Sequence, residues 1–415
     1  MRLQGCCAIM APLYEGGMNM SDLERARGIL LEGGYTCVLC RGDAVHTATA
    51  RGVKPLVDWL DSGLELRGFS AADKVVGRAT AFLYVLLGVK EVHSLVMSTP
   101  ARQALESGGI AATCDREVGG IINRRGDGPC PFEEAVLGIS DPQEALLAIR
   151  KKQFQMRQPP EFTKYTAGKD FILDRTGLSG STVAIFDDFV LKSEPVSEES
   201  ENHLAMLRWL EGRISAPRVL ETVQRDGFRW TLMTRISGEM ACADSYRADP
   251  HRLVRVLANA MKSLWSVDVS GCPVDQSPKA KLDRARAIVD KGAVNMELVD
   301  PETFGENGFP SPAALLSWLE KNAPDFEPVL THGDFCLPNV FLDDGKFSGF
   351  LDLGRSGVGD KWTDIALLWR TLRDNFGGHY GDAVPGFHPD ELFEALGIEK
   401  DEEKLRYYLL MDELF

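Results

Sequence analysis

Two acidic residues and one asparagine late in the sequence have a spacing that suits phosphoryl transfer. Asp334 stands in the segment HGDFCLPN, Asn339 is the last residue of that segment, and Asp352 follows the apolar run FSGFL. Phosphoryl transfer needs a carboxylate that accepts the proton of the attacking hydroxyl, and oxygen ligands for the Mg²⁺ that bridges the phosphates. The pattern matches the catalytic-loop spacing of kinases, with Asp352 at the position of their second, metal-binding Asp.

Two features upstream of this pattern also suit a kinase. The segment RTGLSGST lies between two strand-like runs and fits a loop that covers the phosphates, although such a segment alone is more often a plain hairpin turn. Lys192 lies on the next strand-like run, FVLK, where its charge could meet the α- and β-phosphates. Alone, a lysine at a strand end is usually solvated.

The charge of the chain is unevenly distributed. The net charge is −15, from 46 Lys and Arg against 61 Asp and Glu. Residues 1–157 contain 18 basic and 18 acidic side chains, so the whole excess lies in residues 158–415. This disfavours nucleic acid as a partner, because phosphate backbones need a basic surface. It favours a cationic small molecule, although an acidic balance is also common among cytoplasmic proteins.

Cysteine usage and hydropathy predict a cytoplasmic protein without a membrane span. The nine cysteines do not form a disulfide framework, and we interpret Cys37 and Cys40, in the single motif CVLC, as two buried strand thiols. Residues 1–20 lack the apolar core of a signal peptide and read as a loose leader. No run of about 18 apolar residues is present.

Residues 21–155 alternate between strand and helix patterns, which predicts an α/β domain. The run YTCVLCRGDAVHTATA reads as two strands joined at Gly42, and EVHSLVMS reads as another strand. A helix is predicted between Ser70, as its N-cap, and Gly88, as its stop. A Thr-Pro pair and an Asp-Pro pair open two more helices.

Two prolines in QFQMRQPPE indicate a linker over residues 156–161. The domain that follows, 162–415, begins with strand-like segments to about residue 236 and is mainly helical over 237–415. This predicts a small β-rich lobe on a larger α-rich lobe. Ser197 is predicted to cap a helix, and the run KWTDIALLWRTLRDNFG sets five large apolar side chains on one helical face: Trp362, Ile365, Trp369, Leu372 and Phe376.

On these residues the sequence from about 162 to its end resembles the aminoglycoside 3′-phosphotransferase family. The resemblance is carried by HGDFCLPNVFLDDGKFSGFLDLGRSGVGDKWTDIALLWRTLRDNFG, by LRWLEGRISAPRVL and by YYLLMDELF. It implies a protein-kinase-like bilobal α+β fold that uses ATP and Mg²⁺. It also implies that Asp334 is the catalytic base, and that Asn339 and Asp352 bind Mg²⁺.

The resemblance assigns further residues to the nucleotide site. Lys192 would contact the phosphates, and Ser179 would lie in the covering loop. Backbone groups of Thr234 and Ile236, in the hinge segment MTRIS, would meet adenine. Asp364, in WTDIA, resembles a buried Asp that supports the catalytic loop.

Because aminoglycosides are polycations, their site should be lined by carboxylates, which also steer the encounter. The resemblance assigns substrate contacts to six residues: Glu302 and, less closely aligned, Glu306 in VDPETFGENGFP, then Arg355, and finally Asp412, Glu413 and the terminal carboxylate of Phe415.

The sequence departs from the family at the helix acid that should pair with Lys192. His203 stands at that position, with Glu201 two residues and Glu199 one turn earlier. We therefore expect either that Glu199 takes over or that Lys192 is less well held. Val190 stands where some relatives stack a side chain on adenine.

The first domain resembles uncharacterised bacterial domains with a cytidine-deaminase-like, three-layer fold, on the stretches RGVKPLVDWL, DKVVGRATA, VMSTPARQAL and NRRGDGPCPFEEAV. A zinc deaminase needs H/C-x-E and P-C-x-x-C at two helix starts. Here the first helix offers Asp73 and Lys74, and Cys130 has no cysteine partner, so no zinc is expected. These three residues and Glu133 either line a polar ligand pocket or have ordinary helix-start and core positions.

The sequence thus predicts a metal-free deaminase-like domain fused to an ATP-dependent kinase. The predicted reaction phosphorylates a hydroxyl of an aminoglycoside, the 3′-hydroxyl, which would confer resistance. Two alternatives stay open: a kinase for another small hydroxylated metabolite, and a weakly catalytic ATP-binding sensor whose first domain recognises the ligand.

Overall fold

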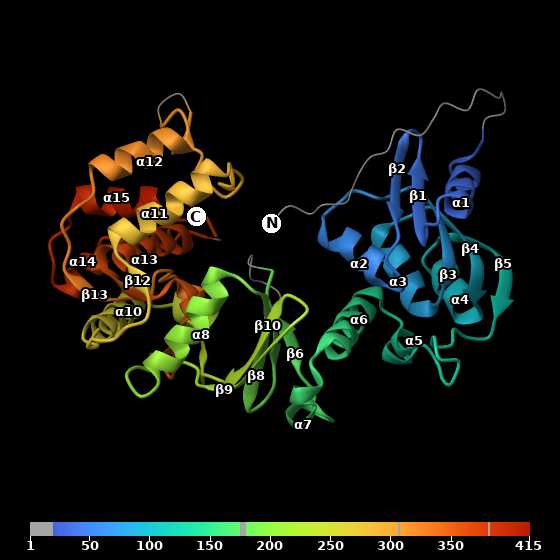
Figure 1. Ribbon diagram of the computed structural model, residues 1–415, viewed down its shortest axis with the longest axis horizontal. Helices are drawn as coiled ribbons and strands as arrows, with labels where there is room; N and C mark the ends of the chain where they lie inside the picture. The colour runs from blue at the N-terminus through green and yellow to red at the C-terminus, as the bar shows by residue number, and fades with distance from the viewer. Residues whose placement is uncertain (1–19, 175–179, 306–307, 381) are drawn as a thin grey trace. The chain divides into compact units, whose positions relative to one another are not determined.

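The computed structural model of the chain describes residues 20–174, 180–305, 308–380 and 382–415. The chain divides into two compact units, Met1–Gln158 and Pro159–Phe415, drawn in Figure 1 from blue to red. The leader predicted for residues 1–20 lies outside the described residues up to residue 19. None of the described helices is both long enough and apolar enough to cross a membrane.

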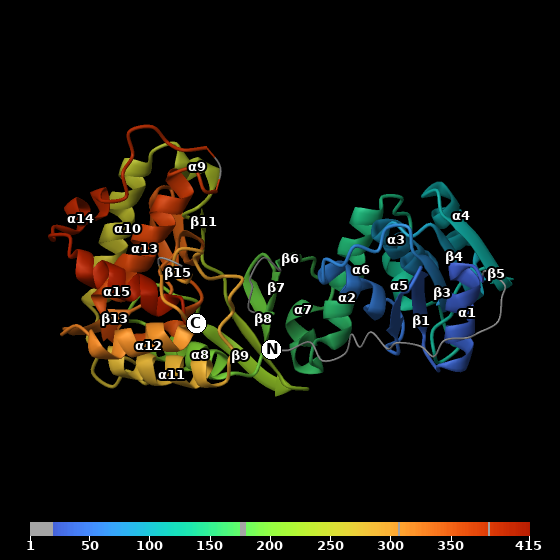
Figure 2. The ribbon, with the colours of Figure 1, turned by 90° about the horizontal axis from the view of Figure 1, so that it is seen from above.

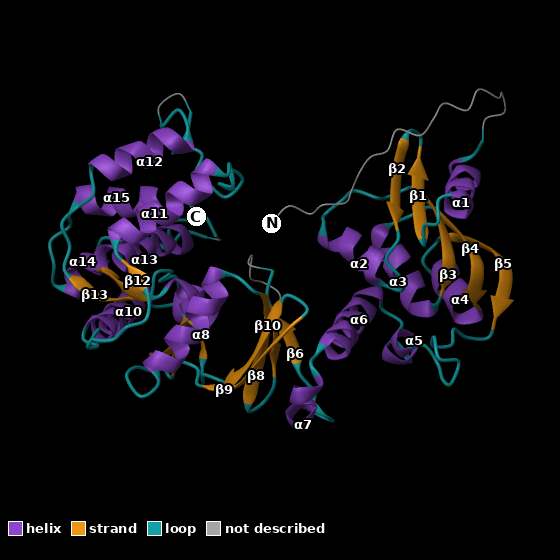
Figure 3. Cartoon of the chain, in the orientation of Figure 1, coloured by secondary structure: helices purple, strands orange, loops and turns teal. Residues whose placement is uncertain are grey.

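The first unit is built on a five-stranded sheet in the order β2-β1-β3-β4-β5. Strand β1 pairs antiparallel with β2 and β3, whereas β3, β4 and β5 are parallel. The strands are β1 (Cys37–Arg41), β2 (Ala44–Ala48), β3 (Ser70–Val76), β4 (Glu91–Ser98) and β5 (Ala111–Val118), coloured orange in Figure 3. The two strands predicted to turn at Gly42 and the strand EVHSLVMS are confirmed.

Helices cover both faces of this sheet. Side chains alternate along β1, so Val38 and Cys40 pack under α1 while Cys37 and Leu39 pack in the core of the other face. The helices are α1 (Asp22–Glu32) on the first face, and α2 (Lys54–Asp61), α3 (Arg78–Leu87), α4 (Thr99–Ser107), α5 (Pro131–Ala135) and α6 (Pro142–Arg157) on the second. The two Xaa-Pro helix starts are confirmed in α4 and α6.

The interpretation of the CVLC motif as buried strand thiols is confirmed. Cys37 and Cys40 are both buried in β1, and they point to opposite faces of the sheet. The Cys37 Sγ lies 3.0 Å from the hydroxyl of Tyr84, and burial raises the pKa of the Cys37 thiol well above its ordinary value.

The helix predicted between Ser70 and Gly88 is half wrong. Residues 70–76 form the central strand β3, and the helix begins only after Gly77, its N-cap. The first three residues of β3, Ser70, Ala71 and Ala72, are all buried, so this segment lacks the alternation of a half-buried strand. Its Ala, Asp and Lys residues also have low strand propensity, which favours reading it as part of the helix that follows. The stop is confirmed, since Gly88 ends α3 in the left-handed conformation.

The second unit begins with the 3₁₀ turn η1 (Pro160–Phe162) and α7 (Thr163–Thr166), followed by an antiparallel sheet in the order β6-β7-β8-β10-β9. Figure 2 shows α8 beside this sheet. The elements are β6 (Ile172–Asp174), β7 (Thr182–Ile185), β8 (Phe189–Pro195), α8 (Glu198–Leu210), β9 (Val219–Arg225) and β10 (Phe228–Thr234). Ser197 caps α8, as predicted.

The rest of the second unit is mainly helical, with two three-stranded sheets, β11-β14-β15 and β12-β16-β13. The strands are β11 (Glu239–Met240), β12 (Asp275–Gln276), β13 (Pro328–Thr331), β14 (Val340–Asp343), β15 (Lys346–Phe350) and β16 (Gly357–Asp360). The helices are α9 (Asp244–Arg247), α10 (Pro250–Trp265), α11 (Pro278–Asp290), α12 (Pro312–Lys321), α13 (Lys361–Phe376), α14 (Glu391–Leu396) and α15 (Glu402–Asp412).

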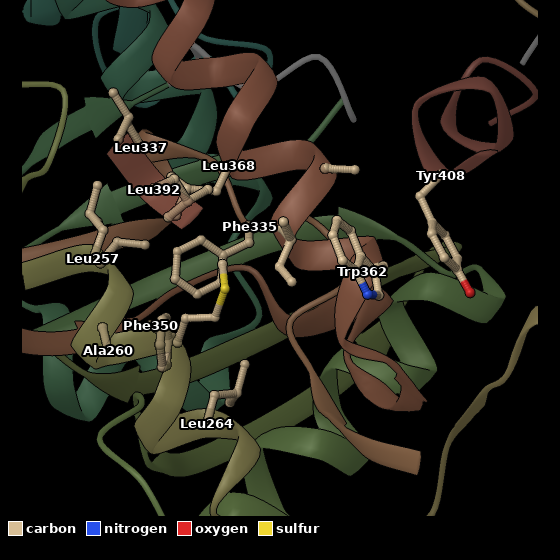
Figure 4. Close-up of a cluster of buried hydrophobic side chains, with 14 of the residues drawn as sticks. Leu257, Ala260, Leu264, Phe335, Leu337, Phe350, Trp362, Leu368, Leu392 and Tyr408 are labelled. Atoms are coloured by element: carbon tan, nitrogen blue, oxygen red, sulfur yellow. The ribbon is translucent and has the colours of Figure 1, made fainter. Parts of the chain in front are cut away.

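One large apolar core underlies this helical part, and Figure 4 shows side chains from it. Phe335 and Phe350 pack edge to face in this core, with ring centroids 5.5 Å apart. They flank the segments that hold the predicted catalytic residues, so the core fixes the backbone on which those residues stand. The apolar face predicted for 361–376 is confirmed in α13, apart from Trp369, which is half-buried.

Candidate active site

The predicted catalytic residues lie on two neighbouring turns. Asp334 follows β13, and Asn339 ends the 3₁₀ turn η2 (Leu337–Asn339). The Asn339 side-chain amide donates to the Asp334 carboxylate at 2.9 Å and to its backbone carbonyl at 3.0 Å. The Leu351 N–H donates to the Asn339 carbonyl at 2.9 Å, so the turn that carries Asp352 is tied to the same loop.

Asp364, on α13, anchors the loop that carries Asp334. It is fully buried on α13, and its two carboxylate oxygens accept the backbone N–H groups of His332 and Gly333, each at 2.8 Å. Burial raises the pKa of Asp364, against the effect of His332 and these two N–H groups. Gly333 has φ +80°, and a Cβ there would lie 1.9 Å from the Arg355 carbonyl, so the loop requires glycine at this position.

Asp352 faces two nitrogen-bearing side chains of the small lobe, Lys192 on β8 and His203 on α8. Its backbone is left-handed, with φ 52°, at the start of the 3₁₀ turn η3 (Leu353–Arg355). The Lys192 Nζ lies 3.2 Å from its Oδ1, and the His203 Nδ1 lies 3.6 Å from the same oxygen. Burial would raise the pKa of the Asp352 carboxyl, but His203 and Lys192 outweigh burial and hold this pKa well below its ordinary value.

Glu194 is the partner of Lys192 that sequence reasoning missed. The Lys192 Nζ lies 3.0 Å from the Glu194 Oε2, and both side chains are buried on β8. Their spacing of two residues sets them on one face of the strand, and that spacing was the available signal. Burial opposes the charge of Lys192, but Asp352 and Glu194 outweigh it, so the pKa of Lys192 is raised.

The expectation that Glu199 takes over is wrong. Glu199 lies 3.5 Å from the guanidinium of Arg355, and no ion pair joins it to Lys192 in the described part of the chain. Glu201 contacts Arg229, which faces Glu194 across the β8–β10 pair. The alternative, a loosely held lysine, is wrong too, since Glu194 and Asp352 both contact Lys192.

The predicted hinge residues lie at the end of β10 and just after it. Thr234 ends that strand, and its N–H donates to the Arg218 carbonyl at 2.9 Å. The N–H of Ile236 has no hydrogen bond to another described residue, so it can serve a ligand. Val190 is half-buried on β8. Ser179 lies outside the described residues, and so does Glu306 of the predicted substrate loop.

The predicted substrate residues at the C-terminus meet basic partners. Arg355 Nη1 lies 3.7 Å from Asp412 Oδ1, and Arg370 contacts both Asp412 and Glu413. The N–H of Asp300 donates to Glu413 at 2.8 Å, which ties the loop that carries the exposed Glu302 to the C-terminus.

A cavity of about 390 Å³ opens beside these groups, lined among others by Glu199, Lys281, Arg355, Asp412 and Phe415. Burial lowers the pKa of Lys281 to about 8, although Asp412 and Asp364 oppose this. Lys281 was missed from the sequence. It stands with Leu282 and Ala285 on the apolar stripe of α11, which marks it as a buried cation.

The four candidate residues of the first unit line one cavity there. Asp73 and Lys74 lie on β3 and not at a helix start, because the helix begins after Gly77. Cys130 is the N-cap of α5, and Glu133 lies on that helix. In the described part of the chain, no group of three or more His, Cys, Asp or Glu could hold a metal ion.

This arrangement of carboxylate, side-chain amide, second carboxylate and paired lysine is that of a phosphoryl-transfer enzyme. A model of the Phosphotransferase enzyme family matches residues 171–390, more than half of the chain, and the chain belongs to this family. A second model, described as Domain of unknown function (DUF1893), matches residues 25–153.

The curated relatives that the chain matches include two aminoglycoside 3′-phosphotransferases. The chain is 32% identical over 273 residues to an aminoglycoside 3′-phosphotransferase of Enterococcus faecalis, covering 63% of this chain and 99% of that protein. It is 31% identical over 272 residues to an aminoglycoside 3′-phosphotransferase of Staphylococcus aureus, with the same two coverages.

Solved structures agree in fold with the second unit. An aminoglycoside-3′-phosphotransferase of type VIII superposes with a TM-score of 0.51 at 27% identity, covering 65% of this chain and 99% of that one. The Streptomyces rimosus aminoglycoside phosphotransferase APH(3″)-Id superposes with a TM-score of 0.52 at 24% identity, covering 64% of this chain and 98% of that one. The kinase-like fold predicted for the second unit is thereby confirmed.

Proposed function

We propose that the second unit transfers the γ-phosphoryl group of ATP to the 3′-hydroxyl of an aminoglycoside and so confers resistance. The observation that carries this proposal is the meeting of Asp334, Asn339, Asp352 and the paired Lys192 at one site, in a chain whose relatives act on aminoglycosides. A phosphate on the drug would cancel part of the positive charge that attracts it to anionic RNA. Because the reaction consumes ATP, the proposed place of action is the cytoplasm.

Asp334 would act as the base for the substrate hydroxyl. Its carboxylate is half-buried and held by the Asn339 amide, so its orientation is set before the substrate arrives. As the O–P bond forms, the hydroxyl proton passes to this carboxylate, and the bond between the γ-phosphorus and the β,γ-bridging oxygen breaks.

The residues here fit a Mg²⁺ site. The Asn339 amide oxygen and the Asp352 carboxylate are the hard oxygen donors that Mg²⁺ prefers, and the lowered pKa of Asp352 keeps it ionised at neutral pH. When bound, Mg²⁺ would neutralise charge on the β- and γ-phosphates. His203 would remain beside Asp352 and orient the carboxylate from α8.

Glu194 would position Lys192 for the α- and β-phosphates. It would thus replace the helix acid of the family, whose position is taken by His203 in this chain. We expect Glu194→Gln to raise the KM for ATP about tenfold with little change in kcat, because a charge-assisted contact worth about 1.4 kcal/mol is lost. Steady-state kinetics at varied ATP checks this. The matched control is Glu221→Gln on β9, because the Glu221 carboxylate pairs with the exposed Lys164 and not with Lys192. Equal KM values for ATP in wild type and Glu194→Gln would contradict the role.

The substrate would bind at the cavity beside Asp412. Asp412 already contacts Arg355 and Arg370, and the buried Lys281 adds positive charge nearby, so a cationic drug must displace the two arginine contacts to reach Asp412. We expect Asp412→Asn to raise the KM for an aminoglycoside about tenfold and to leave the KM for ATP unchanged. Asp283→Asn, an exposed acid on α11, is the control.

Phosphate transfer by the purified full chain tests the proposal. With Mg²⁺ and ATP, at least one member of an aminoglycoside panel should gain a phosphate group, detected by mass spectrometry. Transfer only to other hydroxylated metabolites would favour a different small-molecule kinase. ATP binding without transfer to any acceptor would favour a sensor.

For the first unit we propose the cytidine-deaminase-like fold. This is supported by the strand order β2-β1-β3-β4-β5, in which an antiparallel pair precedes three parallel strands, with helices on both faces.

A further inference from the structure

A large cavity in the first unit has no part in phosphoryl transfer. Its volume is about 870 Å³, within the range of small-molecule sites. It lies where β3 passes into α3, facing the segment before α5, all labelled in Figure 1. Its walls combine apolar side chains, including Leu56, Ile121 and Phe132, with charged groups of both signs.

The acidic side chains in the cavity are already engaged. Asp73 accepts hydrogen bonds from the Tyr84 hydroxyl at 2.8 Å and from the Val75 N–H at 2.9 Å. Glu133 accepts the Ala79 N–H at 3.1 Å and so caps the start of α3.

The third acid, Asp127, accepts the Asn123 side-chain amide at 2.8 Å. Burial also raises the pKa of Asp73 to about 6. Each carboxylate in the wall therefore has a donor within the first unit.

The basic side chains in the same wall are not engaged. Arg51, Lys74, Arg124 and Arg125 all line the cavity, and among the described residues none of these four side chains makes a hydrogen bond or ion pair. They come from three separate segments: the loop after β2, strand β3 and the turn before α5. Four unpaired cations around one cavity repel one another and attract an anion.

The turn that carries two of these cations is preorganised. The Asn123 side-chain oxygen accepts the N–H groups of Arg125 and Gly126 at 3.0 and 2.9 Å. The ends of the turn are joined by hydrogen bonds from Asn123 N–H to the Gly128 carbonyl and from Cys130 N–H to the Ile121 carbonyl. A guanidinium on a fixed turn loses less freedom on binding, and its planar fork matches a phosphate group.

We propose that this cavity binds a phosphate-bearing small molecule with an apolar body. The phosphate would lie among Arg124, Arg125, Lys74 and Arg51, and the body would lie on the side of Leu56 and Phe132. A phosphate is favoured over a single carboxylate because it offers a second negative charge and three acceptor oxygens to four unpaired cations.

The test uses the full chain and three probes: phenyl phosphate, phenol as the same body without the anion, and inorganic phosphate as the anion without the body. Hydrogen exchange locates the binding, and calorimetry gives its affinity. We expect phenyl phosphate to slow exchange over residues 121–130, phenol to have no such effect, and affinity to fall as salt is raised.

Two double variants then separate the site from general charge effects. R124A/R125A should weaken phenyl phosphate at least tenfold and abolish protection of 121–130. R116A/K152A removes two cations that do not line the cavity and should bind as wild type does. If the Tm of R124A/R125A is clearly below that of wild type, K74Q/R51Q is used in its place. Absent protection of 121–130 with both phosphate probes, or equal affinity in wild type and R124A/R125A, would overturn the proposal.

Discussion

Asp334→Asn is expected to lower kcat for phosphate transfer about a thousandfold, because the amide cannot accept the hydroxyl proton. The substitution keeps the shape of the side chain, and its amide oxygen can still accept the Asn339 bond now seen at 2.9 Å. The KM for ATP should therefore change little. Steady-state kinetics, with an aminoglycoside that the wild-type protein phosphorylates, measures both kcat and the KM for ATP.

The control for this variant is Asp344→Asn. Asp344 is exposed in the hairpin between β14 and β15, with φ 50°, a conformation that asparagine tolerates. This substitution removes the same negative charge as Asp334→Asn, ten residues further along the chain. Its kcat should equal that of wild type. A kcat for Asp334→Asn within tenfold of wild type would remove Asp334 from the role of base.

Asp364→Ala is expected to lower the free energy of unfolding of the second unit by about 2–4 kcal/mol, because it leaves two buried N–H groups unpaired. The loss of stability is smaller than the full cost of two unpaired buried N–H groups, because the variant no longer has to bury a carboxylate. The loop that holds Asp334 loses its anchor as well, so kcat should fall with stability. Denaturant unfolding followed by the tryptophans of the second unit gives the stability.

The matched change is Asp283→Ala, which removes an exposed acid of α11 paired with Lys279 and Arg286. Exposed pairs contribute little, so its unfolding should resemble that of wild type. The free energy of unfolding of Asp364→Asn should lie between those of wild type and Asp364→Ala, because the one amide oxygen can still accept one of the two N–H groups. Equal unfolding midpoints for Asp364→Ala and Asp283→Ala would contradict the anchoring role.

Much of the fold could be read from local signals. Turn and cap residues such as Gly42, Ser197 and Gly88 marked element ends because their backbone or side-chain chemistry is local. The strand over 70–76 could not be recognised. Its identity depends on pairing with β1 and β4, which are distant in sequence, and the burial of Ser70, Ala71 and Ala72 in succession removes the alternation that marks a strand.

The arrangement of the candidate site was predictable where spacing along one segment determines it, as for Asp334, Asn339 and Asp352, whose two turns are joined by hydrogen bonds. It was not predictable where partners come from different elements. The choice of Glu194 over Glu199 for Lys192 depends on how β8 and α8 face each other, and Glu199 instead meets Arg355. The acidic C-terminus likewise proved to be paired with Arg370, a residue of α13 whose role no motif indicated.

The site of phosphorylation tests the central claim most directly. The purified chain is incubated with Mg²⁺, ATP and a pair of aminoglycosides that differ only in the 3′-hydroxyl, and the products are analysed by mass spectrometry and ³¹P NMR. We predict one added phosphate, on the 3′ oxygen, for the drug that has this hydroxyl, and none for the drug that lacks it. Phosphorylation of both drugs, or of neither while ATP still binds, would contradict the account.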